Sequence, residues 1–355
     1  MKILLHIGSP KAGSSFLQSA CARAREELAS NGIYFPVGTP HDESCMQRGR
    51  ISAGNALHLA RYLKAGEWSK ADSWLKEAID AALARSCETL LLSSEWLLGS
   101  AAESGRLEKL AVILRSHGAS RIELLMIMRD PPGQLISLYK HRAKAGSVPP
   151  IDQWVTKGYE LPDRLRRLRH EVDASGVDLI VRAYGKEPGA LERIFFEDWL
   201  KTAVPVQAQG AIVNPSLSLS ELVMLRRLRA HHAGLVPILY ERLLVVAPTS
   251  KVEGRAMKDF AQQVAMNSVA EHADEWRIWN GMLPAAERFQ IPAAGPAPGE
   301  EPSSLELSDL QLGAVMELLA DATRPRLIAQ LFWQIRLRPL LSRIKQVLFP
   351  WHTRR

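Results

Sequence analysis

The sequence predicts an α/β fold, a mostly parallel and doubly wound sheet of about five strands followed by a helical C-terminal part. Two observations lead to this prediction. Short, nearly continuous apolar runs alternate with longer amphipathic segments, as expected when helices cover both faces of a sheet. The first apolar run ends at a loop of small residues, and that loop opens a helical segment.

The five expected strands are apolar runs bounded by polar residues, Gly or Pro. They cover residues 3–7, 33–36, 89–92, 122–128 and 177–181. Apolar residues at helical spacing predict helices over residues 14–29, 67–85 and 131–144. The pattern is helical from about residue 188, most clearly over 218–229, 235–246 and 255–272.

The expected domain organisation has three parts. Residues 1–290 form the α/β domain, with its helical extension from about residue 188. Residues 291–304 contain four prolines and two glycines without an apolar period, which is typical of a linker. Residues 305–355 form a basic amphipathic helical tail.

The net charge of +7 in 355 residues is concentrated at the C-terminus. Residues 324–355 hold eight basic side chains and no acidic one, which leaves 37 basic against 38 acidic side chains in the rest. This distribution argues against nucleic acid as the partner. The tail fits an anionic membrane surface best, and the alternative is packing on its own domain or on a second copy of the chain.

The chain lacks the sequence features of secreted and membrane-spanning proteins. Three scattered cysteines are too few for a disulfide framework, and no spacing suggests zinc. No apolar run has the length of a signal peptide core or a membrane span. We therefore expect a cytoplasmic protein that could lie peripherally on the inner face of the membrane.

The loop after the first expected strand has the composition of a phosphate cradle. Its small residues let successive N–H groups converge on an anion, and the helix N-terminus adds its unpaired donors. It is not a Walker A loop, because Ser14 stands where that motif has lysine and the lysine is Lys11 instead. The alternative is a strand–helix turn with no ligand.

This loop resembles that of the sulfotransferases that use 3′-phosphoadenosine 5′-phosphosulfate (PAPS), which have a P-loop-like fold. The matching segment is Pro10-Lys11-Ala12-Gly13-Ser14-Ser15. The resemblance implies that Lys11, Ala12, Gly13, Ser14 and Ser15 bind the 5′-phosphosulfate and that Lys11 stabilises the leaving group. Many relatives have threonine at the position of Ala12, so one hydroxyl contact is lost here.

A second segment extends the resemblance. In this family, an Arg at a strand end and a Ser eight positions later bind the 3′-phosphate, and Arg129 and Ser137 have that separation. A guanidinium suits a phosphate, and a hydroxyl two helical turns further could complete the site. The alternative for Arg129 is an ion pair with Asp130.

Transfer to a hydroxyl requires a base, and Glu95 is the candidate. It follows the expected strand 89–92, and ligands of open α/β folds bind at the carboxyl ends of the strands. The alternative is a helix-capping or surface carboxylate. Asn55, His58 and His141 are weaker candidates for contacts to the acceptor.

The function that follows is transfer of the sulfuryl group of PAPS to a hydroxyl of a carbohydrate or glycolipid, which releases 3′,5′-adenosine bisphosphate. The scheme requires no metal. One alternative is a small-molecule kinase using ATP and Mg²⁺, with Glu95 positioning the metal. Another is a non-catalytic, membrane-associated scaffold with a vestigial nucleotide fold. Self-association is left open.

Overall fold

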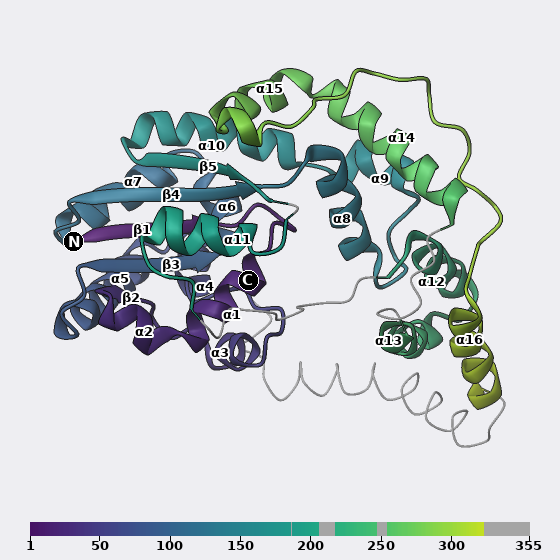
Figure 1. Ribbon diagram of the computed structural model, residues 1–355, viewed down its shortest axis with the longest axis horizontal. Helices are drawn as coiled ribbons and strands as arrows, with labels where there is room; N and C mark the ends of the chain where they lie inside the picture. The colour runs from purple at the N-terminus through teal and green to yellow at the C-terminus, as the bar shows by residue number, and fades with distance from the viewer. Residues whose placement is uncertain (186, 206–216, 247–253, 323–355) are drawn as a thin grey trace. The chain divides into compact units, whose positions relative to one another are not determined.

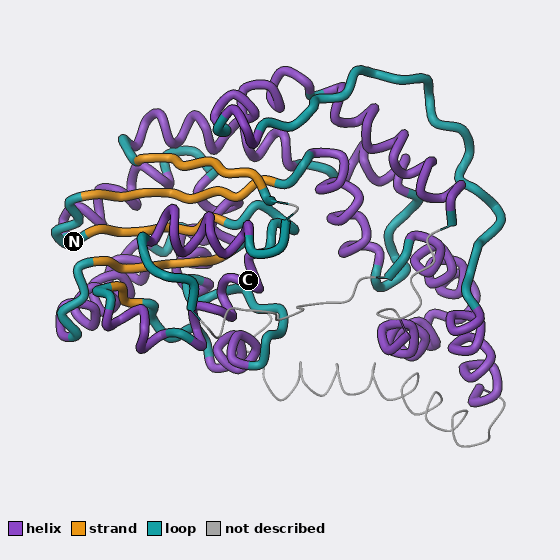
Figure 2. The backbone as a smooth tube through the Cα atoms, in the orientation of Figure 1, coloured by secondary structure: helices purple, strands orange, loops and turns teal. Residues whose placement is uncertain are grey.

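The computed structural model describes residues 1–185, 187–205, 217–246 and 254–322, and it confirms the predicted α/β fold. Five parallel strands form one sheet in the order β2-β3-β1-β4-β5 (Figures 1 and 2). The strands are β1 (Lys2–Ile7), β2 (Ile33–Tyr34), β3 (Thr89–Ser94), β4 (Arg121–Met128) and β5 (Asp178–Ala183). Each lies where an apolar run predicts it.

Helices occupy most of the remaining described chain. Between the strands lie α1 (Ser14–Arg23), α2 (Arg25–Ser30), α3 (Pro40–Gln47), α4 (Leu57–Ala65), α5 (Trp68–Ala84), α6 (Trp96–Ala101), α7 (Arg106–Ser116), α8 (Pro131–Ala143), α9 (Ile151–Gly158) and α10 (Leu161–Ser175). After β5 come α11 (Ala190–Glu192), a π-helix (Arg193–Leu200), α12 (Leu219–His232), α13 (Val236–Val246), α14 (Arg255–Glu271), α15 (Ala273–Met282) and α16 (Asp309–Ala322), with short 3₁₀ turns at Ala233–Leu235 and Ala285–Glu287. None of these helices is long and apolar enough to cross a membrane.

The chain divides into two compact units, and the division cuts across the boundaries expected from the sequence. The first unit comprises Met1–Leu138, Val155–Asn214 and Gln262–Pro298 and contains the whole sheet. The second comprises Tyr139–Trp154, Pro215–Ala261 and Gly299–Arg355. The expected linker has no helix or strand, but Asn267 of α14 holds it through Gly295 N and Pro296 O. Of the expected tail, only residues 305–322 are described, and residues 324–355 lie outside.

Within the second unit, α12 begins with a capping box. The Ser218 hydroxyl accepts a hydrogen bond from Glu221 N, and the Glu221 carboxylate accepts one from Ser218 N. Two donors at the helix start are thereby satisfied reciprocally. The helix expected over residues 218–229 thus begins after Ser218, in the pattern Ser-x-x-Glu that is typical of a capping box.

Helices cover both faces of the sheet in the first unit. On one face, α1 and the π-helix pack over the central strands, with Leu17, Phe195 and Phe196 in the buried cluster. On the other face, α5 and α6 contact β3. Burial on both faces explains why each strand is a continuous apolar run.

The predicted helix over residues 14–29 is wrong at one position. Ala24 leaves helical geometry, with φ −97° and ψ 19°, and separates α1 from α2. Arg25 therefore starts a new helix, and its guanidinium reaches out to Phe35 O and to Glu43 of α3. The local spacing of apolar residues does not reveal this contact, because its partners lie outside the helix.

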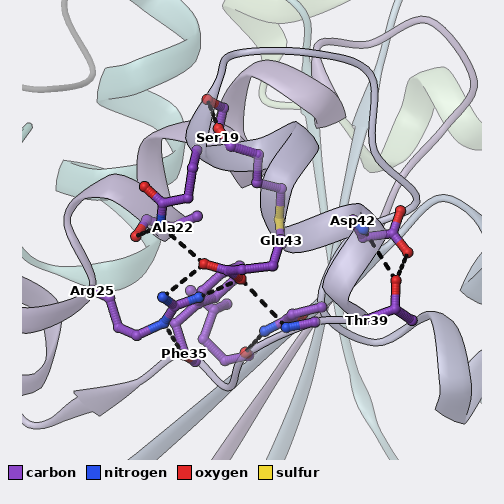
Figure 3. A network of polar contacts seen from close by, with 12 residues as sticks. Ser19, Ala22, Arg25, Phe35, Thr39, Asp42 and Glu43 are labelled. Atoms are coloured by element: carbon purple, nitrogen blue, oxygen red, sulfur yellow. Dashed lines mark hydrogen bonds and ion pairs between the residues drawn. The ribbon is translucent and has the colours of Figure 1, made fainter.

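A polar network fixes α3 against α1 and α2 (Figure 3). The Arg25 guanidinium donates to both carboxylate oxygens of Glu43, at 2.9 and 2.8 Å. Gln47 donates to Ala22 O, and the Ser19 hydroxyl donates to Met46 O. Burial raises the pKa of the Glu43 carboxyl, but hydrogen bonds from Arg25 and Gln47 and the charge of Arg25 outweigh it, so the pKa lies below its usual value.

We predict that Arg25→Ala destabilises the first unit far more than removal of an exposed arginine. The Arg25 and Glu43 side chains are only 16% and 19% exposed, so the substitution leaves a carboxylate in a poorly solvated place. The expected loss is about 2–4 kcal/mol in urea unfolding. Arg85→Ala is the control, because the Arg85–Glu26 pair is 47% and 82% exposed and should contribute under about 1 kcal/mol. Equal losses in the two variants would contradict the prediction.

Candidate functional site

The three segments that carry the predicted chemistry follow three neighbouring strands. The loop 8–15 follows β1, Glu95 follows β3 and Arg129 follows β4, and β1 lies between the other two. Parallel strands about 4.8 Å apart bring their carboxyl ends to one edge of the sheet. The strand order thus brings together three segments that span more than a hundred residues of the sequence.

The loop 8–15 curls back on its own start. A Cβ on Gly8 would lie 2.4 Å from Ser14 Oγ and 3.1 Å from Glu95 Cγ, so a larger residue there would collide with both side chains. Lys11 and Gly13 have φ of 66° and 83°, the left-handed turns that reverse the chain. At the start of α1, Phe16 N and Leu17 N donate to Gly13 O, which leaves the N–H groups of Ser14 and Ser15 without a partner in the helix, and the N-cap residue Gly13 has no side chain to accept from them.

Ser14 is the most informative residue of the loop. Its side chain is buried at 1% exposure, and its Oγ has no hydrogen-bond partner among the described residues. A buried hydroxyl without a partner costs free energy, so its presence at a helix N-terminus favours a ligand that would accept a hydrogen bond from it. Lys11 and Ser15 are half-buried at the same loop. The residues therefore fit a bound phosphate or sulfate group.

Ala12 contributes differently from its neighbours. Its methyl group is buried in the apolar cluster, and its N–H donates to Ser9 O at 3.3 Å. Of the five predicted loop residues, it is the one whose side chain packs into the core. A threonine hydroxyl at this position would enter an apolar environment, which gives a physical reason for alanine.

Glu95 lies beside the loop at the N-cap position of α6, but its side chain does not cap that helix. It precedes α6, but its side chain makes no cap hydrogen bond, and Ser94 Oγ accepts from Trp96 N instead. Burial raises the pKa of the Glu95 carboxyl above its usual value, and the positive charge of Lys11 offsets part of that effect. The helix-capping alternative is thus wrong. A carboxylate of raised pKa beside a lysine suits proton transfer.

Arg129 keeps its guanidinium half-exposed at the end of β4. Its Nε lies 3.9 Å from Asp130 Oδ1, a long contact between two partly exposed groups that contributes little. Asp130 Oδ2 instead accepts from Gly133 N at 3.0 Å, at the start of α8. Ser137 is half-buried in α8, seven positions from Asp130 along the chain.

Sequence reasoning missed Gln134, which joins α8 to the loop. This buried side chain donates to Pro10 O at 3.3 Å and accepts from the Tyr159 hydroxyl at 3.1 Å. A buried amide in a helix gives no signal in sequence, because its partners are distant. Its contacts position the loop relative to the helix that carries Ser137.

A cavity of about 1310 Å³ lies beside the residues that follow β5. Asp130, Tyr184 and Arg193 are among its lining residues. Tyr184 also lies against the loop, since its Cε2 would be 3.2 Å from a Cβ on Gly13. Sequence reasoning did not single out Tyr184, whose position depends on where β5 joins the sheet.

The weaker acceptor candidates have diverse environments. The buried Asn55 amide donates to Leu91 O and accepts from Ser93 N, at 3.0 and 2.7 Å, so it extends the hydrogen bonding of β3 beyond the short β2. His58 stacks on Tyr62 in α4, with ring centroids 6.0 Å apart. His141 belongs to the second unit.

A buried polar network lies on the sheet directly behind the loop. The Ser93 hydroxyl lies 2.8 Å from His6 Nδ1 and accepts from Gln18 of α1 at 3.2 Å, and Gln18 in turn accepts from Ser52. Gly54 permits this packing, because a Cβ there would lie 2.1 Å from Ser93 O. The network connects β1, β3 and the helix that the loop opens.

The comparisons with known proteins add no assignment. No protein-family model, curated protein or solved structure matches the chain. Within the described ranges, no group of three or more His, Cys, Asp or Glu side chains could hold a metal ion.

We predict that His6 makes the first unit less stable in mild acid. Burial lowers the pKa of His6 to about 4, against about 6.5 in an unfolded chain. The neutral ring is therefore fully compatible with folding above about pH 6.5, and stability falls as the pH drops from there towards 4, by on the order of 3 kcal/mol. Urea unfolding of the wild type and His6→Gln between pH 7.5 and 4.5 isolates this contribution. Parallel pH curves would contradict it.

Proposed function

We propose that the protein is a PAPS-dependent sulfotransferase that acts on a hydroxyl of a carbohydrate or glycolipid. The observation that carries the proposal is the buried Ser14 hydroxyl, which has no partner among the described residues and lies in a loop whose Gly8 packs close to the Glu95 side chain. A group suited to binding an anion and a carboxyl of raised pKa therefore lie together at the carboxyl edge of the sheet. The resemblance of residues 10–15 and 129–137 to this family supports the choice of PAPS.

The proposed binding mode assigns each part of PAPS to residues of the first unit. The 5′-phosphosulfate is held by the N–H groups of Gly13, Ser14 and Ser15, by the two serine hydroxyls and by Lys11. Arg129 and Ser137 hold the 3′-phosphate, which distinguishes PAPS from ATP. The cavity beside the residues that follow β5 offers room for the nucleoside, with Tyr184 at its wall.

The proposed reaction needs a base and a cation. Glu95 takes the proton of the acceptor hydroxyl as the new oxygen–sulfur bond forms. Lys11 neutralises the negative charge that develops on the phosphate oxygen as its bond to sulfur breaks. The products are the sulfate ester and 3′,5′-adenosine bisphosphate. The kinase alternative has less support, because buried Ser14 stands where the Walker A lysine would be.

We predict that 3′,5′-adenosine bisphosphate binds more tightly than AMP and that Arg129→Ala removes the difference. Loss of one charge-assisted phosphate contact should weaken the bisphosphate about 10- to 100-fold and leave AMP unchanged. Isothermal titration calorimetry measures both ligands. Arg277→Ala, which removes an exposed arginine paired with Asp274, is the control. Equal affinity for the two nucleotides, or tight binding of ATP with Mg²⁺, would overturn the assignment.

We predict that Glu95→Gln lowers turnover about 10²- to 10⁴-fold without changing the affinity for the bisphosphate. Transfer of label from [³⁵S]PAPS into a glycan and lipid extract of the producing cell provides the assay. The base must be ionised, so the wild-type rate should rise with pH through the raised pKa of Glu95. Glu103→Gln, an exposed carboxylate past the end of α6, is the control. An unchanged pH profile in Glu95→Gln would exclude Glu95 as the base.

A further inference from the structure

An exposed tryptophan with two cations lies next to Glu95. Trp96 is the first residue of α6 and is 47% exposed. Arg61 and Lys64 of α4 lie over its ring, with Arg61 Cζ at 5.8 Å and Lys64 Nζ at 5.9 Å from the centroid. We call Arg61, Lys64 and Trp96 the Trp96 face. All three belong to the first unit.

The charges of the Trp96 face are not balanced locally. No carboxylate in the described ranges pairs with Arg61 or Lys64, and both side chains are exposed. Other cations nearby are paired: Lys70 with Glu67, Arg106 with Glu103 and Arg164 with Glu160. An indole in contact with two unpaired cations offers an apolar surface and positive charge at the same place.

The Trp96 face is fixed to the carboxyl edge of the sheet. Trp96 directly follows Glu95, so their Cα atoms are about 3.8 Å apart. Just before α4, Ala56 N donates to Ser93 O, and the Asn55 amide holds the β3 backbone. Both helices of the face therefore begin at the end of β3. A molecule on the face lies next to the proposed base.

We propose that the Trp96 face binds the acceptor and that this acceptor is an acidic carbohydrate. The C–H face of a pyranose ring is apolar and flat enough to stack on an indole. Arg61 and Lys64 would pair with a carboxylate on the same or the adjoining sugar. A neutral sugar would leave both cations unused. The inference rests on the proposed function, since it places the acceptor beside Glu95.

Binding of defined oligosaccharides tests the face without an assay of turnover. The probe is pentagalacturonate, which carries a carboxylate on each ring, and the neutral comparison is maltopentaose. The variants are Trp96→Ala and the double variant Arg61→Ala/Lys64→Ala. The double variant Arg255→Ala/Arg277→Ala is the charge-matched control, because it removes two exposed arginines elsewhere. Circular dichroism melting checks that each variant folds.

We expect the wild type to bind pentagalacturonate at least tenfold more tightly than maltopentaose. Trp96→Ala should weaken that binding about tenfold, and the Arg61/Lys64 double variant should abolish the preference and the salt dependence. The control should bind like the wild type. No preference for the acidic sugar, or full affinity in both face variants, would overturn the inference. Loss of binding to phosphatidylglycerol vesicles in these variants, without sugar binding, would overturn it in favour of a lipid surface.

Titration of 3′,5′-adenosine bisphosphate separates this inference from the proposed function. The face variants should bind the nucleotide like the wild type, since they leave the loop and Arg129 intact. Sugar binding through the face with no affinity for the nucleotide would contradict the proposed function and support the face as a carbohydrate site. Nucleotide binding without sugar binding would contradict the face alone.

Discussion

The candidate site depends on one close contact, the approach of Ser14 and Glu95 to the backbone of Gly8. A side chain at Gly8 would meet the Ser14 hydroxyl and the Glu95 side chain, so glycine allows the end of the loop to return to the end of β1 without displacing either. That return buries the Ser14 hydroxyl and places the Glu95 carboxylate against the loop, where burial favours its protonated form. The candidate anion site and the candidate proton acceptor are therefore held together by the same turn.

The buried polar network around Ser93 holds the elements that carry this contact in place. Ser93 precedes Glu95 by two residues, and its hydroxyl is shared by His6 of β1 and Gln18 of α1. Asn55 and Gly54 hold the adjacent backbone of β3. Polar groups in a core are costly unless satisfied, and this group connects the strand before the loop, the helix after it and the strand that carries Glu95. The network restricts relative motion of those three elements.

Sequence predicts the sheet better than the site. Strands buried on both faces must be apolar throughout, so their positions follow from composition alone. Lys11, Ser14, Glu95 and Arg129 could be found because each follows a strand, and parallel strands end at one edge. Gln134 and Tyr184 could not be found, because their roles depend on distant partners. The break at Ala24 escaped for the same reason, since Arg25 is held by groups outside its own helix.

The positive charge of the chain is unevenly distributed. Residues 324–355 carry eight basic and no acidic side chains, and the remainder, with 37 basic against 38 acidic side chains, is close to neutral. Several cations of this body form local ion pairs, as Arg25 does with Glu43 and Arg182 with Glu287. The cations at the carboxyl edge of the sheet differ from these in their partners. Arg129 makes one long contact, and Arg61 and Lys64 share an indole. Arg129 follows β4, and the indole of Trp96 that Arg61 and Lys64 contact follows β3, so the cations lie near the ends of the two strands that flank β1, where the proposed PAPS and an acidic acceptor would meet.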